Sequence, residues 1–399
     1  MTIFRPADAE AVQNTVAWAV GESQTLEIRG GGSKRALGRP AVADHVLDLG
    51  GLCEIIDYDP SELVLTAQAA TPMATIAELL AGQRQMLAFE PPDLRGVLPS
   101  EAGPTLGGAI ACNLAGPRRV RAGAARDHFL GFAAVNGWGD SWKAGGRVVK
   151  NVTGYDLCKL QAGAFGTLSV LTEITVRVLP RPEASCTLVM LGLDDAAAVR
   201  VMAQALNTPH EVSAAAHLPA GAAARAGFAG PATVFRLEGP RPSIDARAAA
   251  LVPVLGGVER LEQGDTEALW TRIGAAQPVL PDAPVLWRVG PTPSEAAAVF
   301  GRIRARLPSA EALYDWGGGL LWVAVGEADE GACEDGGAAV VRGALVSGHA
   351  TLIRAPDAVR AAVPPFQPAA GPLDALARRV KASFDPNGTL NPGRMTEGV

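Results

Sequence analysis

The sequence predicts an α+β protein of two domains, and three observations support that prediction. Strand-like and helix-like stretches alternate along the chain as far as Pro180. A long alternating stretch, typical of a strand, then stops at Pro180-Arg181-Pro182. Beyond it, alanine-rich helical stretches alternate with strands. We therefore expect one domain over residues 1–182, a second over 183–370, and a C-terminal helix and turn over 371–399.

The first domain shows several strand patterns and one clear helix pattern. Thr71 is expected to cap the helix and Pro72 to occupy its first position. Met73, Ile76, Leu79 and Leu80 would then share one face. Strands are expected at residues 25–29, 46–49, 63–66, 133–136 and 167–179.

The second domain and the tail follow the same reasoning. Helices are expected at residues 194–206 and 294–306, and strands at 233–237 and 320–325. The tail predicts an amphipathic helix over 372–384, followed by two turn clusters over 385–393. The apolar face of that helix would consist of Leu373, Leu376, Val380 and Phe384.

Composition excludes several classes of protein. A net charge of −6 without interleaved basic and aromatic residues gives no reason to expect nucleic-acid binding. The five cysteines form no CxxC pair, which argues against a metal cluster and fits a reducing cytosol. The start lacks the pattern of a signal peptide, and no apolar run is long enough to span a bilayer. We expect a soluble cytoplasmic protein without a metal site.

Three glycine-dense stretches, at residues 29–33, 104–108 and 163–168, each sit beside a strand pattern. Glycines at such junctions let backbone approach a ligand closely and expose amide groups to anionic oxygens. No GxGxxG opens a helix after the first strand, and no Gly-Lys dipeptide exists, which excludes a Rossmann fingerprint and a P-loop. The pattern favours a large phosphate-bearing cofactor held by several separate loops.

The order of these motifs resembles a known family. RGGGS after a strand, PTLGGxxxxN, Gly123, Asn136-Gly137 and GxxGTL are similar to the FAD-binding domain of the vanillyl-alcohol oxidase and D-lactate dehydrogenase type, also called the PCMH type. The resemblance covers roughly residues 1–182 and implies two α/β subdomains with an extended FAD between them. The cofactor-binding residues that it implies are Arg29, Gly30, Gly31, Gly32, Ser33, Pro104, Thr105, Gly107, Gly108, Asn113, Gly123, Gly163, Gly166 and Leu168.

Two further segments resemble the 2-hydroxy-acid branch of that family. One is K-N-x-x-G-Y-D-L at residues 150–157, and the other is the D-P-x-x-x-x-N-P-G-R-M ending at 385–395. In relatives this ending folds back, which would bring Asn391 near the flavin ring. The RGGGS loop contains neither histidine nor cysteine, so we expect noncovalent FAD, with His128 the remaining candidate for a covalent link.

The second domain lacks a signature that catalytic members of the branch carry, H-x-G-D-G-N-x-H. Its most similar stretch, residues 348–354, keeps only the first histidine, His349, so no metal site can be built there. His349 is either a catalytic base or a structural strand residue. Arg354 either binds a substrate carboxylate or is an exposed strand arginine.

The whole chain resembles the second flavin subunit of bacterial glycolate oxidase complexes. The resemblance implies oxidation of glycolate to glyoxylate together with a catalytic flavin subunit and an iron–sulfur subunit, and membrane association only through that complex. Two alternatives stay open. One is a self-sufficient FAD-dependent 2-hydroxy-acid dehydrogenase using His349 and Arg354, and the other is a non-catalytic scaffold of the same fold.

Overall fold

The chain folds into two compact units. The computed structural model describes residues 1–147, 154–279, 283–326, 334–369 and 371–397, so the first half of the K-N-x-x-G-Y-D-L segment, residues 150–153, lies outside the described residues. Unit 1 comprises residues 1–114, 123–181 and 368–399, and unit 2 comprises 115–122 and 182–367. The inclusion of residues 115–122 in unit 2 is a feature that the sequence patterns do not predict.

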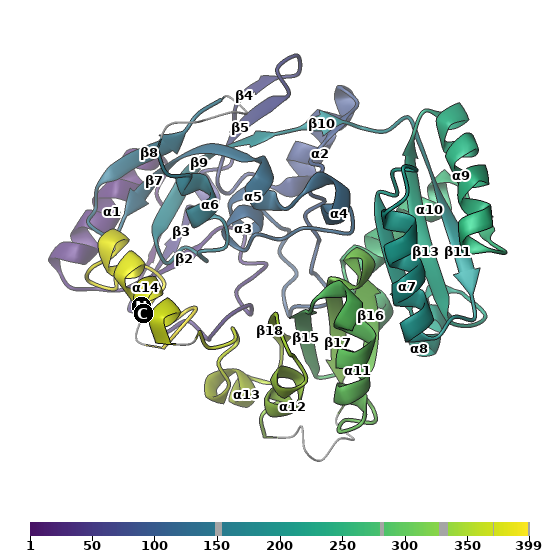
Figure 1. Ribbon diagram of the computed structural model, residues 1–399. Helices are drawn as coiled ribbons and strands as arrows, with labels where there is room; N and C mark the ends of the chain where they lie inside the picture. Colours follow the sequence, from purple (N-terminus) through teal and green to yellow (C-terminus); the bar gives the residue numbers. More distant parts are fainter. Residues whose placement is uncertain (148–153, 280–282, 327–333, 370, 398–399) are drawn as a thin grey trace. The chain divides into compact units, whose positions relative to one another are not determined.

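Unit 1 is built around a parallel and an antiparallel sheet (Figure 1). Among the described residues, the strand orders are β1-β3-β2 for the parallel sheet, β4-β5-β9-β7-β8 for the antiparallel sheet and β10-β6 for a short pair. The strands are β1 (Ile3–Phe4), β2 (Leu26–Arg29), β3 (His45–Asp48), β4 (Ile55–Asp59), β5 (Val64–Gln68), β6 (Gln85–Met86), β7 (Phe129–Asn136), β8 (Ser141–Gly145), β9 (Ser169–Arg177) and β10 (Leu179–Pro180). The helices are α1 (Ala9–Gly21), α2 (Met73–Gly82), α3 (Leu106–Ala111), α5 (Ala125–His128), α6 (Leu157–Gln161) and α14 (Gly371–Phe384).

The start of α2 differs from the expectation. Pro72 is the residue before the helix, and it offers no side-chain cap. Thr71 is fully buried, and its hydroxyl donates to the Glu54 carbonyl at 3.1 Å instead of capping the helix. The predicted capping role of Thr71 is therefore wrong, because a tertiary partner competes for the hydroxyl.

Unit 2 contains one eight-stranded antiparallel sheet in the order β14-β11-β13-β12-β16-β17-β15-β18. Its strands are β11 (Ala184–Leu191), β12 (Ala214–Leu218), β13 (Ala232–Gly239), β14 (Glu259–Leu261), β15 (Val285–Gly290), β16 (Glu311–Asp315), β17 (Leu320–Val325) and β18 (His349–Arg354). Its helices are α4 (Arg119–Ala122), α7 (Asp195–Leu206), α8 (Ala220–Ala226), α9 (Arg241–Leu255), α10 (Gln263–Gly274), α11 (Ala296–Arg304), α12 (Ala338–Gly343) and α13 (Asp357–Ala362).

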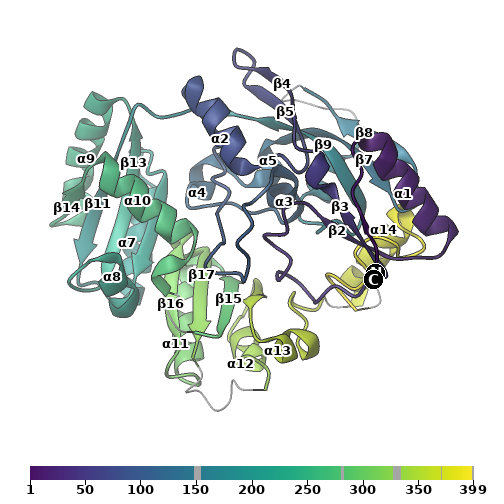
Figure 2. The ribbon, with the colours of Figure 1, turned by 180° about the vertical axis from the view of Figure 1, so that it is seen from behind.

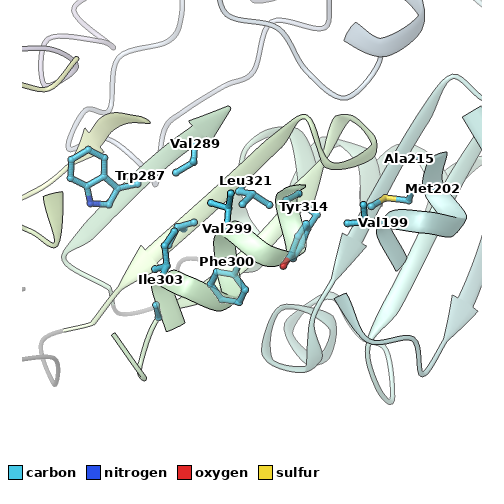
Figure 3. Close-up of a cluster of buried hydrophobic side chains, with 14 of the residues drawn as sticks. Val199, Met202, Ala215, Trp287, Val289, Val299, Phe300, Ile303, Tyr314 and Leu321 are labelled. Carbon is cyan, nitrogen blue, oxygen red and sulfur yellow. The ribbon is translucent and has the colours of Figure 1, made fainter. Parts of the chain in front are cut away.

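The main core of unit 2 lies between one face of this sheet and the helices α7, α9 and α11. Figure 3 shows side chains of α11 against Tyr314 and Leu321 of the strands, and side chains of α7 beside Ala215 of β12. Trp287 and Val289 point into this core, so the alternation of a strand places the side chain of Arg288 on the opposite face. Seen from behind, that opposite face carries α10 (Figure 2), whose Trp270 indole N–H donates to Thr187 at 2.9 Å.

The C-terminal tail belongs to unit 1, where α14 lies beside β7 and β8 (Figure 1). The Phe384 ring packs 5.5 Å from that of Trp142, centroid to centroid. The predicted apolar face is only partly covered, since Leu373 and Leu376 are 65% and 47% exposed. The turn after the helix is fixed by a buried ion pair, with Lys381 Nζ 2.6 Å from Asp385 Oδ2.

No helix in the described part of the chain combines the length and the apolar character needed to cross a membrane.

Candidate functional site: a glycine-lined pocket in unit 1

A pocket with an empty volume of about 890 Å³ lies in unit 1, where two glycine loops meet. One wall is the loop that leaves β2, and the other includes the loop that enters α3. The predicted residues that line it are Arg29, Gly30, Gly31, Gly32, Ser33, Thr105, Gly107, Gly108, Gly166 and Asn391. The further lining residues include Glu27, Lys34, Cys112, Gln161, Phe165, Ser169 and Arg394.

The glycines allow the backbone segments to approach closely. A Cβ at Gly31 would lie 2.8 Å from the Gly103 carbonyl oxygen, and one at Gly107 would lie 2.7 Å from that of Ala69. Gly107 and Gly108 already use their amides, which donate to Ala69 O and to Thr105 Oγ1. The amides of Gly31, Gly32 and Ser33 donate no hydrogen bond to any described residue. The first loop is therefore the part of the pocket with amides available for an anion.

Lys34 places a positive charge in the pocket wall, and the sequence motifs did not identify it as a site residue. Its side chain is 9% exposed, and its ammonium lies 3.2 Å from the Ser33 hydroxyl. Burial lowers the pKa of Lys34, because it disfavours the charged ammonium. A bound anion would have the opposite effect and stabilise the charged form. The two neighbouring arginines are already paired, Arg29 with Asp48 at 2.9 Å and Arg35 with Glu27 at 2.6 Å. Only the position of Lys34 directly after RGGGS could have indicated this role.

Two buried polar atoms in the pocket wall have no hydrogen-bond partner among the described residues. They are Gln161 Nε2 and Ser169 Oγ, and both side chains are 2% exposed. Leaving a buried donor unpaired costs about 1–3 kcal/mol. A ligand rich in oxygen and nitrogen acceptors would satisfy both groups. Together with the free amides and Lys34, they fit a cofactor with a diphosphate and a polar ring system, such as FAD.

Five of the predicted cofactor residues do not line this pocket, namely Pro104, Asn113, Gly123, Gly163 and Leu168. Asn113 lies at the end of α3, where its side-chain oxygen accepts from the amide of Arg126 at 3.1 Å. Gly163 donates its amide to the Ile110 carbonyl at 3.1 Å. Their contact with a cofactor stays a prediction.

Asn391 closes the pocket through backbone contacts. Its side-chain oxygen accepts from Ile28 N, and its side-chain nitrogen donates to Phe165 O, both at 2.8 Å. A Cβ at Gly166 would lie 2.8 Å from that nitrogen. Asn391 therefore joins β2, which leads into the first glycine loop, to the third glycine loop. A catalytic role for it stays a prediction.

The candidate for covalent attachment, His128, lies away from the pocket, whereas a cysteine that was not a candidate lines it. His128 is fully buried with its ring 5.6 Å from that of Phe89, and it does not line the pocket. Cys112 does line the pocket, and burial raises the pKa of its thiol. A thiol that stays protonated is a poor nucleophile. Noncovalent attachment stays the prediction.

The orphaned atoms lead to a test with two readouts. We expect Gln161→Leu and Ser169→Ala each to weaken FAD binding roughly 3- to 10-fold, because each removes one hydrogen bond to the cofactor. The same changes should leave the cofactor-free protein as stable as before or more so, since each removes an unpaired buried group. Fluorescence titration with FAD and urea unfolding of the apoprotein measure the two effects. The exposed change Gln83→Leu is the control, and unchanged FAD affinity in both pocket variants would contradict the assignment.

The predicted catalytic pair of unit 2 is not brought together. His349 begins β18 and Arg354 ends it, which separates them by about 16 Å along the strand at 3.3 Å per residue. The Arg354 guanidinium donates to the Ala283 carbonyl. One small 2-hydroxy acid cannot contact both residues. Among the described residues, no group of three His, Cys, Asp or Glu side chains could hold a metal ion.

Comparison with known proteins agrees with the pocket. The family described as "FAD binding domain" matches residues 2–145. "Glycolate oxidase subunit GlcE" of Escherichia coli (strain K12) is 36% identical over 390 residues, which are 97% of this chain and 97% of that protein. "Glycolate oxidase subunit GlcD" of Bacillus subtilis (strain 168) is 33% identical over 164 residues, which are 41% of this chain and 33% of that protein.

A solved structure of p-cresol methylhydroxylase with bound substrate has the same fold, with a TM-score of 0.75 at 14% identity, over 99% of this chain and 88% of that one. The α+β fold of the PCMH type and FAD as the cofactor are thus both supported. Identity of 36% along nearly the whole of both chains shows more than a shared fold. This protein belongs to the family of the glycolate oxidase subunit GlcE, a family of FAD-dependent oxidoreductases.

Proposed function

We propose that this chain is the FAD-binding subunit of a glycolate oxidase complex that oxidises glycolate to glyoxylate. In this complex, a catalytic flavin subunit and an iron–sulfur subunit are its partners, and electrons pass to the iron–sulfur subunit. One observation carries the proposal, namely the end-to-end similarity to GlcE, which its name describes as a subunit of glycolate oxidase. The glycine-lined pocket, with its unpaired Gln161 and Ser169 groups, supplies the physical basis for FAD binding.

The residues of unit 1 have separate tasks in this proposal. The amides of Gly31, Gly32 and Ser33 and the ammonium of Lys34 hold the diphosphate, and Asn391 keeps the loops closed around it. FAD, when bound, supplies the two-electron acceptor for oxidation of the hydroxy acid. A fixed pocket of this kind orients the cofactor and excludes water.

One property of His349 favours the self-sufficient alternative. Partial burial lowers the pKa of its imidazole, and the charges of Arg288 and Arg119 lower that pKa further. The ring is therefore neutral at pH 7 and able to accept the hydroxyl proton of a substrate. Its predicted companion Arg354 lies at the other end of the strand, however. We therefore favour a chain that works together with a catalytic partner.

Anaerobic spectroscopy of the purified, FAD-loaded chain separates the possibilities. We expect flavin absorbance that glycolate does not bleach in the isolated chain and does bleach once the partner subunits are added. Bleaching of the isolated chain by glycolate or D-lactate supports the self-sufficient alternative. A colourless protein that cannot be reconstituted with FAD supports the scaffold. Release of the flavin on denaturation checks that it is bound noncovalently.

A further inference from the structure

Unit 2 gathers basic side chains on the sheet face opposite its main core. Arg288 of β15 and His349 of β18 lie on neighbouring strands, with Gly290 paired to His349 in the register. The missing side chain at Gly290 leaves room for the imidazole, since a Cβ there would lie 3.2 Å from His349 Cε1. His349 is partly exposed to solvent, and Arg288 is partly buried.

A second arginine joins them from the segment 115–122. Arg119 and Arg288 both stack on the indole of Trp316, with guanidinium carbons 4.4 and 5.0 Å from the ring centroid. The indole is fixed in turn, because its N–H donates to the Gly116 carbonyl at 3.0 Å. The neighbouring Arg118 ties this segment to β13 through Glu238 at 3.0 Å. Two guanidinium groups are thus held beside one aromatic ring.

An unpaired donor lies on the same face. Trp322 of β17 is directly opposite Arg288 in the register, and its side chain is 3% exposed. Its indole N–H has no hydrogen-bond partner among the described residues. A buried N–H of this kind favours a ligand that brings an acceptor.

The two guanidinium groups of this cluster repel each other. Burial lowers the pKa of Arg288 to about 10, the charge of Arg119 acts in the same direction, and Asp315 offsets part of the effect. Asp315 is itself 1% exposed, and its side chain accepts from the Trp316 amide at 2.7 Å. A bound anion would relieve the repulsion between the two guanidinium groups.

We propose that Arg119, Arg288 and His349 form a binding site for the carboxylate of a small 2-hydroxy acid. The identification of the ligand as a 2-hydroxy acid rests on the function proposed above, whereas the anionic character of the ligand rests on the cluster alone. A planar guanidinium binds a carboxylate through two parallel hydrogen bonds. The neutral imidazole of His349 is then available beside the hydroxyl group. In this assignment, Arg288 and Arg119 bind the substrate carboxylate, whereas the sequence had suggested Arg354 for that role.

Calorimetric titration of the FAD-loaded protein with glycolate and with glycolamide tests the site. Glycolamide has nearly the same size without the charge, so we expect glycolate to bind and glycolamide to bind at least about 10-fold more weakly. Arg288→Met and Arg119→Met should each weaken glycolate binding about 10- to 100-fold while FAD content stays unchanged. Arg306→Met removes an exposed arginine of the same unit and should leave binding as in the wild type.

The outcomes separate this site from the proposed function. Wild-type affinity for glycolate in both arginine variants, or equal affinity for glycolamide, overturns the site even if partner subunits support glycolate oxidation. If carboxylate binding depends on the two arginines but the assembled complex shows no flavin reduction, the site stands and the proposed function is wrong. If Arg288→Met fails to fold, Arg288→Lys and Trp322→Phe serve instead. Arg288→Lys should lose less affinity than Arg119→Met, and Trp322→Phe should lose roughly 3- to 10-fold.

Discussion

Replacing Gly31 by valine is expected to yield a folded protein that carries almost no FAD. A Cβ at this position would lie 2.8 Å from the Gly103 carbonyl oxygen and 3.2 Å from Thr105 Cγ2. The two glycine loops would have to move apart, and overpacking of this kind costs about 1–3 kcal/mol. We expect FAD affinity to fall about 10- to 100-fold, measured by the flavin-to-protein ratio and by fluorescence titration.

Gly103→Ala is a matched control for this change. Gly103 belongs to the same loop contact, yet a Cβ there meets no atom within 4 Å. We expect its FAD content to equal that of the wild type. If Gly31→Val retains full FAD affinity, the cofactor does not bind between these loops.

Replacing Asp385 by alanine is expected to destabilise unit 1 by about 3–5 kcal/mol. Asp385 is fully buried with Lys381, and it also accepts from the amides of Thr389 and Leu390 at 2.9 and 2.8 Å. The change would leave the Lys381 ammonium buried without its counter-charge, although it keeps the carbonyls of Thr167 and Leu390. Urea unfolding followed by circular dichroism measures the loss.

Two further variants separate the ion pair from general damage to the helix. The pair Asp374 and Arg378 lies on the same helix at 2.8 Å but is partly exposed, so Asp374→Ala should cost at most about 1 kcal/mol. The double change Lys381→Met with Asp385→Ala should be less destabilising than Asp385→Ala alone, because no charge is left buried. If Asp374→Ala and Asp385→Ala lower the free energy of unfolding equally, burial of the Lys381–Asp385 pair does not increase its contribution to stability.

Much of the local structure could be predicted because local signals decide it. The strand expected at 320–325 is β17 with the same bounds, and Asp194 caps the helix α7 through a 2.7 Å bond to the Ala197 amide. Apolar alternation and N-cap chemistry act over a few residues, so both can be recognised in the sequence. The capping role of Thr71 failed because its partner, Glu54, lies 17 residues earlier in the chain, just before β4.

The sites needed information that no short window of sequence contains. Lys34 and Gln161 matter because they are buried in one pocket, and burial depends on the packing of the whole unit. Arg288 and His349 become neighbours only because the chain places β15 between β17 and β18, which reverses part of the sequence order. Arg119 reaches them because residues 115–122 belong to unit 2. Sequence reasoning consequently chose Arg354, the nearest arginine along the strand.

Calorimetric titration of the apoprotein with FAD is the most direct test that this chain is a flavin-binding subunit. We expect one FAD to bind per chain, with affinity lost in Gly31→Val and reduced in Gln161→Leu. Absence of binding, or binding that neither change affects, would contradict the assignment of FAD to the pocket between the glycine loops.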